Sequence, residues 1–114
     1  MKLRDLRRTV LAEDDLSGAK LTNVNSSASF LNEARLTGAD LTEARLFDAD
    51  LTGTDLSGAN LTGADFTRAI LNAANLSNAN LTRAILRNAD ITGINFTGAI
   101  FDQTFMPDGS IRSE

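Results

Sequence analysis

The aspartates in the middle of the chain are the side chains with the clearest potential for chemistry. Asp48 and Asp50 form an Asp-x-Asp pair like the start of a calcium-binding loop, but the other oxygen ligands are missing at the required spacings. The 114-residue chain contains no His, Cys, Tyr or Trp, so it lacks the commonest general bases and thiolate ligands. Its glycines stand singly rather than in a phosphate-binding loop. We therefore expect no enzyme activity, no small-molecule substrate, no cofactor and no metal ion.

The same aspartates could instead form an acidic outer surface. Residues 33–65 carry more Asp and Glu than Arg, whereas residues 66–101 carry more Arg than Asp, within a formal net charge of −4. We predict an acidic outer face that is made of Asp40, Asp48, Asp50, Asp55 and Asp65. What such a face can do depends on the elements that hold these side chains.

A five-residue repeat sets the positions of these side chains. Between Leu11 and Phe101 every fifth residue is Leu, Ile or Phe, with Ser26 as the single exception. The residue two places before each large one is small, most often Ala, and the residue directly before it is polar as a rule. Glycine gathers two places after the large residue, where a tight turn can require positive φ. The large and small residues are predicted to point inward and the polar residues outward.

A period of five residues excludes both standard elements. On an α-helix, five steps turn a side chain roughly 140° away from the previous one, so the leucines would form no stripe. On a flat strand, an odd period would place successive leucines on opposite faces. A short extended piece followed by a turn lets every leucine reach one axis, and this is the geometry of a solenoid.

Charge pairs indicate how many five-residue units make one coil. Strands of successive coils lie about 4.8 Å apart, so residues separated by one coil are direct neighbours. A coil of fifteen residues would stack Asp40 on Asp55, and a coil of twenty-five would stack Asp40 on Asp65. Repulsion between the two carboxylates would destabilise either arrangement. A coil of twenty avoids both pairs and stacks Asn60 on Asn80, whose amides should form a hydrogen-bonded ladder. We therefore predict a four-sided coil of twenty residues.

Repeats such as Ala59-Asn60-Leu61-Thr62-Gly63 and Ala79-Asn80-Leu81-Thr82-Arg83 resemble the A(D/N)LXX motif of the pentapeptide repeat family. The resemblance covers roughly residues 11–101. It implies an all-β fold, a right-handed quadrilateral parallel β-helix, here with about five coils of twenty residues. It also implies a family that is widespread in bacteria, abundant in cyanobacteria and mostly of unknown function.

The first functional hypothesis is a non-catalytic scaffold or protein-interaction module that presents flat walls to a protein partner. The alternative hypothesis is a DNA-mimicking modulator of DNA gyrase or topoisomerase. The resemblance implies it, because in some members of the family an acidic rod mimics DNA. Such mimicry needs dense acidic columns, but Arg, Lys or Asn interrupts each column and the net charge is only −4. We expect an unknown protein partner and binding to neither nucleic acid nor membrane.

Three parts are expected along the chain. Residues 1–10 form an N-terminal cap, either a short amphipathic helix or a degenerate half-coil, residues 11–104 form the β-helix, and residues 105–114 form a C-terminal plug or tail. The N-terminus lacks the apolar core of a signal peptide. The chain is therefore expected in the cytoplasm.

Apolar side chains gather at the C-terminal end. Phe101, Phe105 and Met106 lie where the five-residue register ends, just before a turn signal at residues 107–109. These side chains either plug the open end of the column or contact a second copy. The chain is therefore expected to be a monomer or a C-terminal homodimer.

Two further large apolar residues stand at outward positions. Phe30 and Ile70 flank Asp50 on one outer wall of the twenty-residue coil. Phe30 either folds over the space that Ser26 leaves in the column or forms a small apolar contact site with Ile70. Scattered exposed apolar residues are ordinary, which favours the first interpretation.

Overall fold

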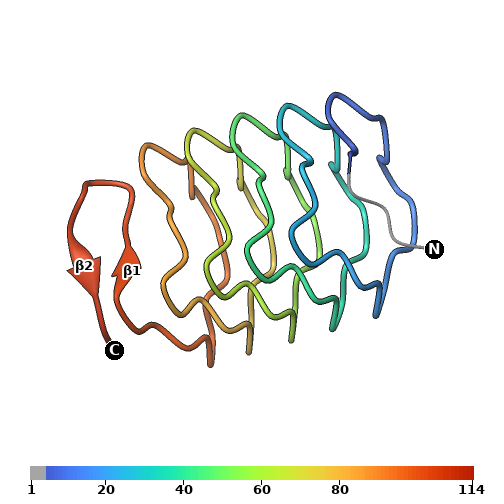
Figure 1. The fold of residues 1–114 in the computed structure, drawn as a ribbon. Coiled ribbons are helices and arrows are strands. Elements are labelled where there is room, and N and C mark those ends of the chain that lie inside the picture. Colours follow the sequence, from blue (N-terminus) through green and yellow to red (C-terminus); the bar gives the residue numbers. More distant parts are fainter. Residues whose placement is uncertain (1–4) are drawn as a thin grey trace.

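The computed structural model describes residues 5–114, which form one rod of stacked coils (Figure 1). The principal extents of the rod are 34 × 21 × 21 Å. The first described coil and the C-terminus lie at opposite ends (Figure 1). Among residues 5–114 there is no helix that is long and apolar enough to cross a membrane.

Parallel bridges join residues that are twenty positions apart. Asn60, for example, pairs with Asp40 in the coil before it and with Asn80 in the coil after it. Every isolated bridge between residues 5 and 105 has this spacing. The twenty-residue coil is therefore confirmed, and the fold is a right-handed quadrilateral parallel β-helix.

The described N-terminal residues already follow the coil. Asp5 bridges to Asn25, and Val10 bridges to Phe30, both in parallel orientation. These residues therefore belong to the first coil rather than to a helix. The expected cap also includes residues 1–4, which lie outside the described part of the chain.

A β-turn ends each side of the coil. In the unit that begins at Leu36, the Ala39 N–H donates to the Leu36 carbonyl at 3.0 Å. The residue two places after Leu36 is Gly38, with φ of 66°. The equivalent residue has positive φ in every unit from residue 8 to residue 103, including non-glycine residues such as Arg68, with φ of 59°. Positive φ at this place is typical of a type II turn, so the fold imposes the left-handed conformation whatever the residue.

The straight part of each wall is short, so most walls show single bridges rather than long strands. A bridging residue such as Asn60 donates its N–H to the Ala39 carbonyl at 2.9 Å and accepts from the Leu41 N–H at 2.8 Å. In the described part of the chain, the strands of more than one residue are β1 (Thr104–Phe105) and β2 (Ile111–Arg112), which pair antiparallel. This hairpin lies beyond the last coil, with β2 outermost (Figure 1).

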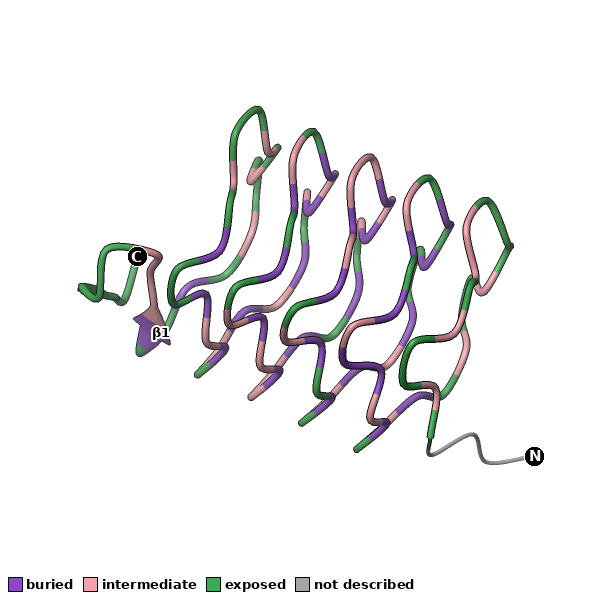
Figure 2. Cartoon of the chain, turned by 90° about the horizontal axis from the view of Figure 1, so that it is seen from above, coloured by how far each residue is buried: buried purple, intermediate pink, exposed green. Residues whose placement is uncertain are grey.

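The core is a single column of large residues with small residues beside it. The large side chains are fully buried along the middle of the rod at Leu36, Leu41, Leu46, Leu51, Leu56, Leu61, Phe66, Leu71, Leu76, Leu81 and Leu86. Burial decreases towards both ends, where Leu6 and Ile91, for example, are only partly covered (Figure 2). The inward assignment of the large and small residues is confirmed along the middle of the rod.

Ser26 interrupts the column, and the structure at this place differs from the favoured prediction. Phe30 does not fold over the space, because it lies on the outer wall with 47% of its surface exposed. Instead, the buried Ser26 and Ser29 hydroxyl groups lie 2.7 Å apart in a hydrogen bond, and Ser29 also donates to the Ser26 carbonyl at 2.6 Å. A hydrogen-bonded pair of small residues satisfies the buried hydroxyls without a covering ring.

Candidate functional site

The outward bridging residues stack into one column on each of four walls. The first wall carries Asp5, Asn25, Arg45, Asp65, Ile85 and Phe105. The second wall carries Val10, Phe30, Asp50, Ile70 and Asp90. The third wall carries Asp15, Arg35, Asp55, Asn75 and Asn95, and the fourth wall carries Lys20, Asp40, Asn60, Asn80 and Ile100. These columns and the turns between them are the surface that a partner can reach.

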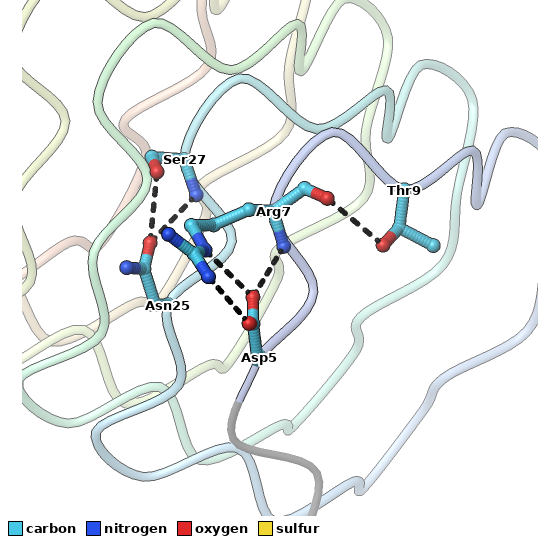
Figure 3. A network of polar contacts seen from close by, with 5 residues as sticks. All are labelled: Asp5, Arg7, Thr9, Asn25 and Ser27. Carbon is cyan, nitrogen blue, oxygen red and sulfur yellow. Dashed lines mark hydrogen bonds and ion pairs between the residues drawn. The ribbon is translucent and has the colours of Figure 1, made fainter.

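Most outward Asp and Asn side chains bind the backbone of their own turn. The Asn25 Oδ1 atom accepts from the Ser27 N–H at 3.2 Å and from the Ser27 hydroxyl at 2.8 Å (Figure 3). Asp5 accepts the Arg7 N–H at 3.2 Å in the same way, and its carboxylate also forms an ion pair with the Arg7 guanidinium at 2.8 Å (Figure 3). These are Asx turns, which hold the N–H two residues further along the chain.

The Asx turns also replace the amide ladder that stacking predicted. The Asn60 side-chain oxygen accepts from the Thr62 N–H at 3.1 Å and from the Thr62 hydroxyl at 2.7 Å. Asn80 accepts from Thr82 in the same manner. The N–H groups of Thr62 and Thr82 have no other acceptor at the turn, so they bind the side-chain oxygens of Asn60 and Asn80 in preference to the amide group of the next coil. The signal was present in the sequence as Asp or Asn followed two residues later by Ser or Thr.

The Asx hydrogen bonds keep several carboxyl groups ionised. The Ser57 hydroxyl, which donates to Asp55, lowers the pKa of that carboxyl below its usual value. The Thr42 hydroxyl lowers the pKa of Asp40 for the same reason. The hydrogen bond from the Arg7 side chain lowers the pKa of Asp5 to about 2. Carboxylates with lowered pKa values are poor general bases, and their oxygens are already used by the turns.

The five aspartates of the predicted acidic outer face do not share a wall. Asp65 lies on the first wall, Asp50 on the second, Asp55 on the third and Asp40 on the fourth. Asp48 has positive φ and lies in the turn between the first and second walls. The twenty-residue coil separates these residues because no two of them are twenty positions apart in the sequence.

Asp48 is the one of these five that forms an ion pair. The Arg68 guanidinium, one coil further along, contacts the Asp48 carboxylate at 2.9 and 3.1 Å. This contact lowers the pKa of Asp48. Within residues 5–114, no cluster of acidic residues is arranged to hold a metal ion.

The apolar candidates occupy two different places. Phe30 and Ile70 are exposed on the second wall on either side of Asp50. Phe101, in contrast, is buried at the C-terminal end, where its ring packs edge-on against Phe96 with a centroid distance of 5.1 Å. The Arg112 guanidinium lies 3.8 Å from the centre of the Phe101 ring and covers it.

Phe105 and Met106 are half-buried at the same end. Phe105 is part of β1, and the Arg87 guanidinium lies 5.9 Å from the centre of its ring. Met106 packs against the end of the column, and its N–H donates to the Ser110 carbonyl at 2.8 Å. The hairpin therefore brings these side chains against the last coil, while Ile111 on β2 stays exposed.

A hollow of about 340 Å³ lies at the other end, lined by Asp5, Arg7 and Arg8. Asp5 and Arg7 pair with each other there and remain more than half exposed. The hollow therefore presents a solvated ion pair rather than an enclosed binding site.

The repeat also matches a known family directly. The pentapeptide repeat family matches residues 27–58, 44–83 and 71–103, which together cover more than half of the chain. The chain belongs to the pentapeptide repeat family. Pentapeptide repeat proteins are structural and interaction modules rather than enzymes as a rule.

Solved pentapeptide repeat proteins share the fold. HetL, a protein involved in heterocyst differentiation regulation from the cyanobacterium Nostoc sp. strain PCC 7120, matches 95% of this chain with a TM-score of 0.92 and 34% identity. A pentapeptide repeat protein from the Arabidopsis thaliana thylakoid lumen matches 84% of the chain and 67% of its own length, with a TM-score of 0.82 and 45% identity. One from the cyanobacterium Cyanothece 51142 matches 84% of the chain and 82% of its own length, with a TM-score of 0.59 and 26% identity.

The present pentapeptide repeat chain spans 51% of the length of HetL, so it corresponds to about half of that protein. A comparison with the curated proteins finds none that matches the chain. The comparisons therefore establish the family and the fold.

Proposed function

We propose that this chain is a non-catalytic scaffold whose outer walls bind a protein partner. The observation that carries the proposal is the fixed spacing of the outward side chains. The bridging residues from Phe30 to Phe105 donate their backbone N–H groups to the preceding coil, and each outward Asp or Asn of an Asx turn is also bound to its own turn. A surface that is already ordered loses little conformational entropy when a partner binds.

The chemistry of the walls supports binding over catalysis. Asp40 and Asp55 accept backbone N–H groups of their own turns, and the hydrogen bonds from Thr42 and Ser57 lower the pKa values of these two carboxyl groups rather than raise them towards neutrality. HetL is involved in the regulation of heterocyst differentiation, and a binding module fits a regulatory role of that kind. Because the chain spans about half of HetL, we propose the binding role and not the pathway.

The distribution of charge argues against mimicry of DNA. A mimic needs rows of carboxylates along one face, whereas the acidic residues are divided among four walls and Arg68 neutralises Asp48. We expect no inhibition and no protection of DNA gyrase by micromolar protein in a supercoiling assay. Inhibition that is lost on replacing Asp55 and Asp65 with Asn would favour the mimic instead.

Affinity capture from the source cell tests the scaffold. We expect the folded protein to retain a specific protein that a Leu56→Asp variant, with a charge in the centre of the column, does not retain. Sedimentation of the purified protein in parallel gives its own state, which we propose to be a monomer or a C-terminal homodimer. A folded rod that retains no protein above the level of the variant would contradict the proposal.

A further inference from the structure

We propose that the second wall is the docking wall, and that its occupant is an amphipathic helix of another protein with one Lys or Arg that pairs with Asp50. This inference rests on the proposed scaffold function and specifies the surface and the partner. It follows from the exposure, the charge and the spacing of the residues on this wall.

Exposed apolar side chains concentrate on the second wall. Val10 is 70% exposed, Phe30 47% and Ile70 41%, and all three belong to the same stacked column. Among residues 5–114, the other large apolar side chains with comparable exposure are Ile100 on the fourth wall and Ile111 in the hairpin. Three exposed apolar side chains in one column, with Asp50 between Phe30 and Ile70, form an apolar surface around a single carboxylate, and such a surface can mark an interaction site.

Asp50 is a carboxylate without a cation in the middle of this column. It bridges to Phe30 on one side and to Ile70 on the other. Its Oδ1 atom accepts from the Thr52 N–H at 3.1 Å and from the Thr52 hydroxyl at 2.7 Å. No Lys or Arg nitrogen of the described residues lies within 4.0 Å of its carboxylate, and Arg68 pairs with Asp48. A partner that covers the apolar residues must therefore supply a cation to this carboxylate.

Charged residues border the wall on both sides. The turn that leads into the second wall carries Arg8, Asp48 and Arg68, and the turn that leads out of it carries Glu13 and Glu33. An apolar centre with a charged rim is the usual composition of a protein–protein interface.

The spacing of the column fits a helix better than a strand. Successive coils lie about 4.8 Å apart, and an α-helix rises about 5.4 Å per turn, so one side chain from each turn stays close to one coil. An extended strand repeats the side chains of one face about every 6.6 Å, so these side chains move out of register with the coils after fewer repeats. Over the four coils from Val10 to Ile70, a helix that lies along the wall meets each of the three exposed apolar residues and Asp50.

The same residues argue against a second copy and against a lipid surface. A two-fold dimer through this wall that is centred on the middle coil would place Asp50 against its own copy, and like charges disfavour that arrangement. Asp50, Glu13 and Glu33 would also be repelled by an anionic membrane. A helix that carries its own cation has neither problem.

The test is a titration with a designed probe. The probe is a synthetic amphipathic helical peptide with a leucine on each turn of one face and a single lysine at the centre of that face. It is added to the ¹⁵N-labelled full chain, and the backbone amide shifts are followed by NMR. We expect the shifts to map to the second wall around Phe30, Thr52 and Ile70, and a peptide with Glu in place of the lysine to bind about tenfold more weakly.

Matched variants separate the charge from the fold. Asp50→Asn keeps the Oδ1 acceptor for Thr52, as Asn60 does for Thr62, but removes the charge, and it should abolish the preference for the lysine peptide. Phe30→Ser should weaken binding of both peptides, whereas Ile100→Ser, which removes an equally exposed side chain from the fourth wall, should leave binding unchanged. Melting temperatures confirm that each variant is folded.

Several results would overturn the inference. They are absence of binding, shifts that map to another wall or to the ends of the rod, equal binding of the lysine and glutamate peptides, or self-association that Phe30→Ser removes. If the cell-derived partner is captured equally well by wild type and Phe30→Ser, the docking wall is wrong and the scaffold function stands. If the peptide binds as expected but no cellular protein is captured, the scaffold function fails, and the second wall is overturned as the docking site of a protein helix.

Discussion

Individual residues of the repeat have separate physical tasks. The Asp or Asn before each large residue caps the N–H two places on, and the Ser or Thr at that place adds its hydroxyl to the same oxygen, as Asp40 and Thr42 show. The third residue of the turn must accept positive φ, which glycine does without strain. The residue types of the repeat are therefore determined by the local backbone conformation as much as by burial.

Replacement of Asp55 tests the Asx turn. Asp55→Ala should lower the free energy of unfolding by about 1 kcal/mol, because the Ser57 N–H loses its acceptor. Asp55→Asn should cost less, since an amide oxygen fills the same role at Asn75. Chemical denaturation of the three proteins gives the comparison, and equal losses for both variants would show that the acceptor is unimportant.

The lowered pKa values predict a loss of stability in acid. Hydrogen bonds from Ser57 and Thr42 lower the pKa values of Asp55 and Asp40 in the folded state below the ordinary value of an aspartate side chain. Their contribution is therefore complete above the unfolded-state pKa and is lost as the pH falls through the folded-state values. The melting temperature should decrease when the pH is lowered below about 4. This decrease should be smaller in the Asp55→Asn variant. A melting temperature that does not change with pH in this range would refute the assignment.

Positive φ makes opposite predictions for two equivalent turn residues. Ala73 has φ of 59°, which costs a non-glycine residue about 1 kcal/mol, so Ala73→Gly should stabilise the protein by up to that amount. Gly58 has φ of 67°, and a Cβ atom added there would meet nothing within 4 Å. Gly58→Ala should therefore destabilise the protein by about 1 kcal/mol through backbone strain alone. Thermal unfolding measures both, and a shift of the same sign in the two variants would contradict the explanation.

At the scale of the element, one coil has no core of its own. The four large residues of a coil meet on the axis, and their burial depends on the coils above and below, as in other solenoids. Figure 2 shows this as a decrease in burial at both ends of the rod. The C-terminal hairpin covers part of one end, with Arg112 over Phe101.

The loss of stability on truncating a core leucine to alanine should depend on its position along the rod. Leu56 is fully buried in the middle coil, and Leu56→Ala should destabilise the protein by about 2–5 kcal/mol. Leu6 is only partly covered in the first described coil, so Leu6→Ala should cost clearly less. Equilibrium denaturation tests the pair, and similar costs would mean that the ends of the column are as tightly packed as its centre.

At the scale of the whole molecule, the rod is nearly one-dimensional, since each coil contacts its neighbours alone. Local opening should therefore begin at the ends and move inwards. Amide hydrogen exchange should be slowest for N–H groups of the middle coils, such as those of Leu56 and Leu61, and fastest for Leu6. Uniform protection along the chain would indicate instead that the rod opens as a single unit.

The sequence by itself determined the architecture, because a period of five with inward residues of fixed size is compatible with one simple geometry. The same argument gave the length of the coil, since Asp40, Asp55 and Asp65 would repel each other at other coil lengths. The turns at the glycine positions were also predictable, because they are local.

The tertiary structure alone decided which side chains meet and which face solvent. Asp48 pairs with Arg68 because the coil places them side by side, whereas the other four predicted acidic residues lie on four different walls. Phe30 stays outside because it stands at an outward bridging position, while the buried Ser26 and Ser29 hydroxyl groups bond each other. The C-terminal hairpin follows no repeat, and its contacts depend on side-chain packing at the end of the column, which a periodic pattern does not encode.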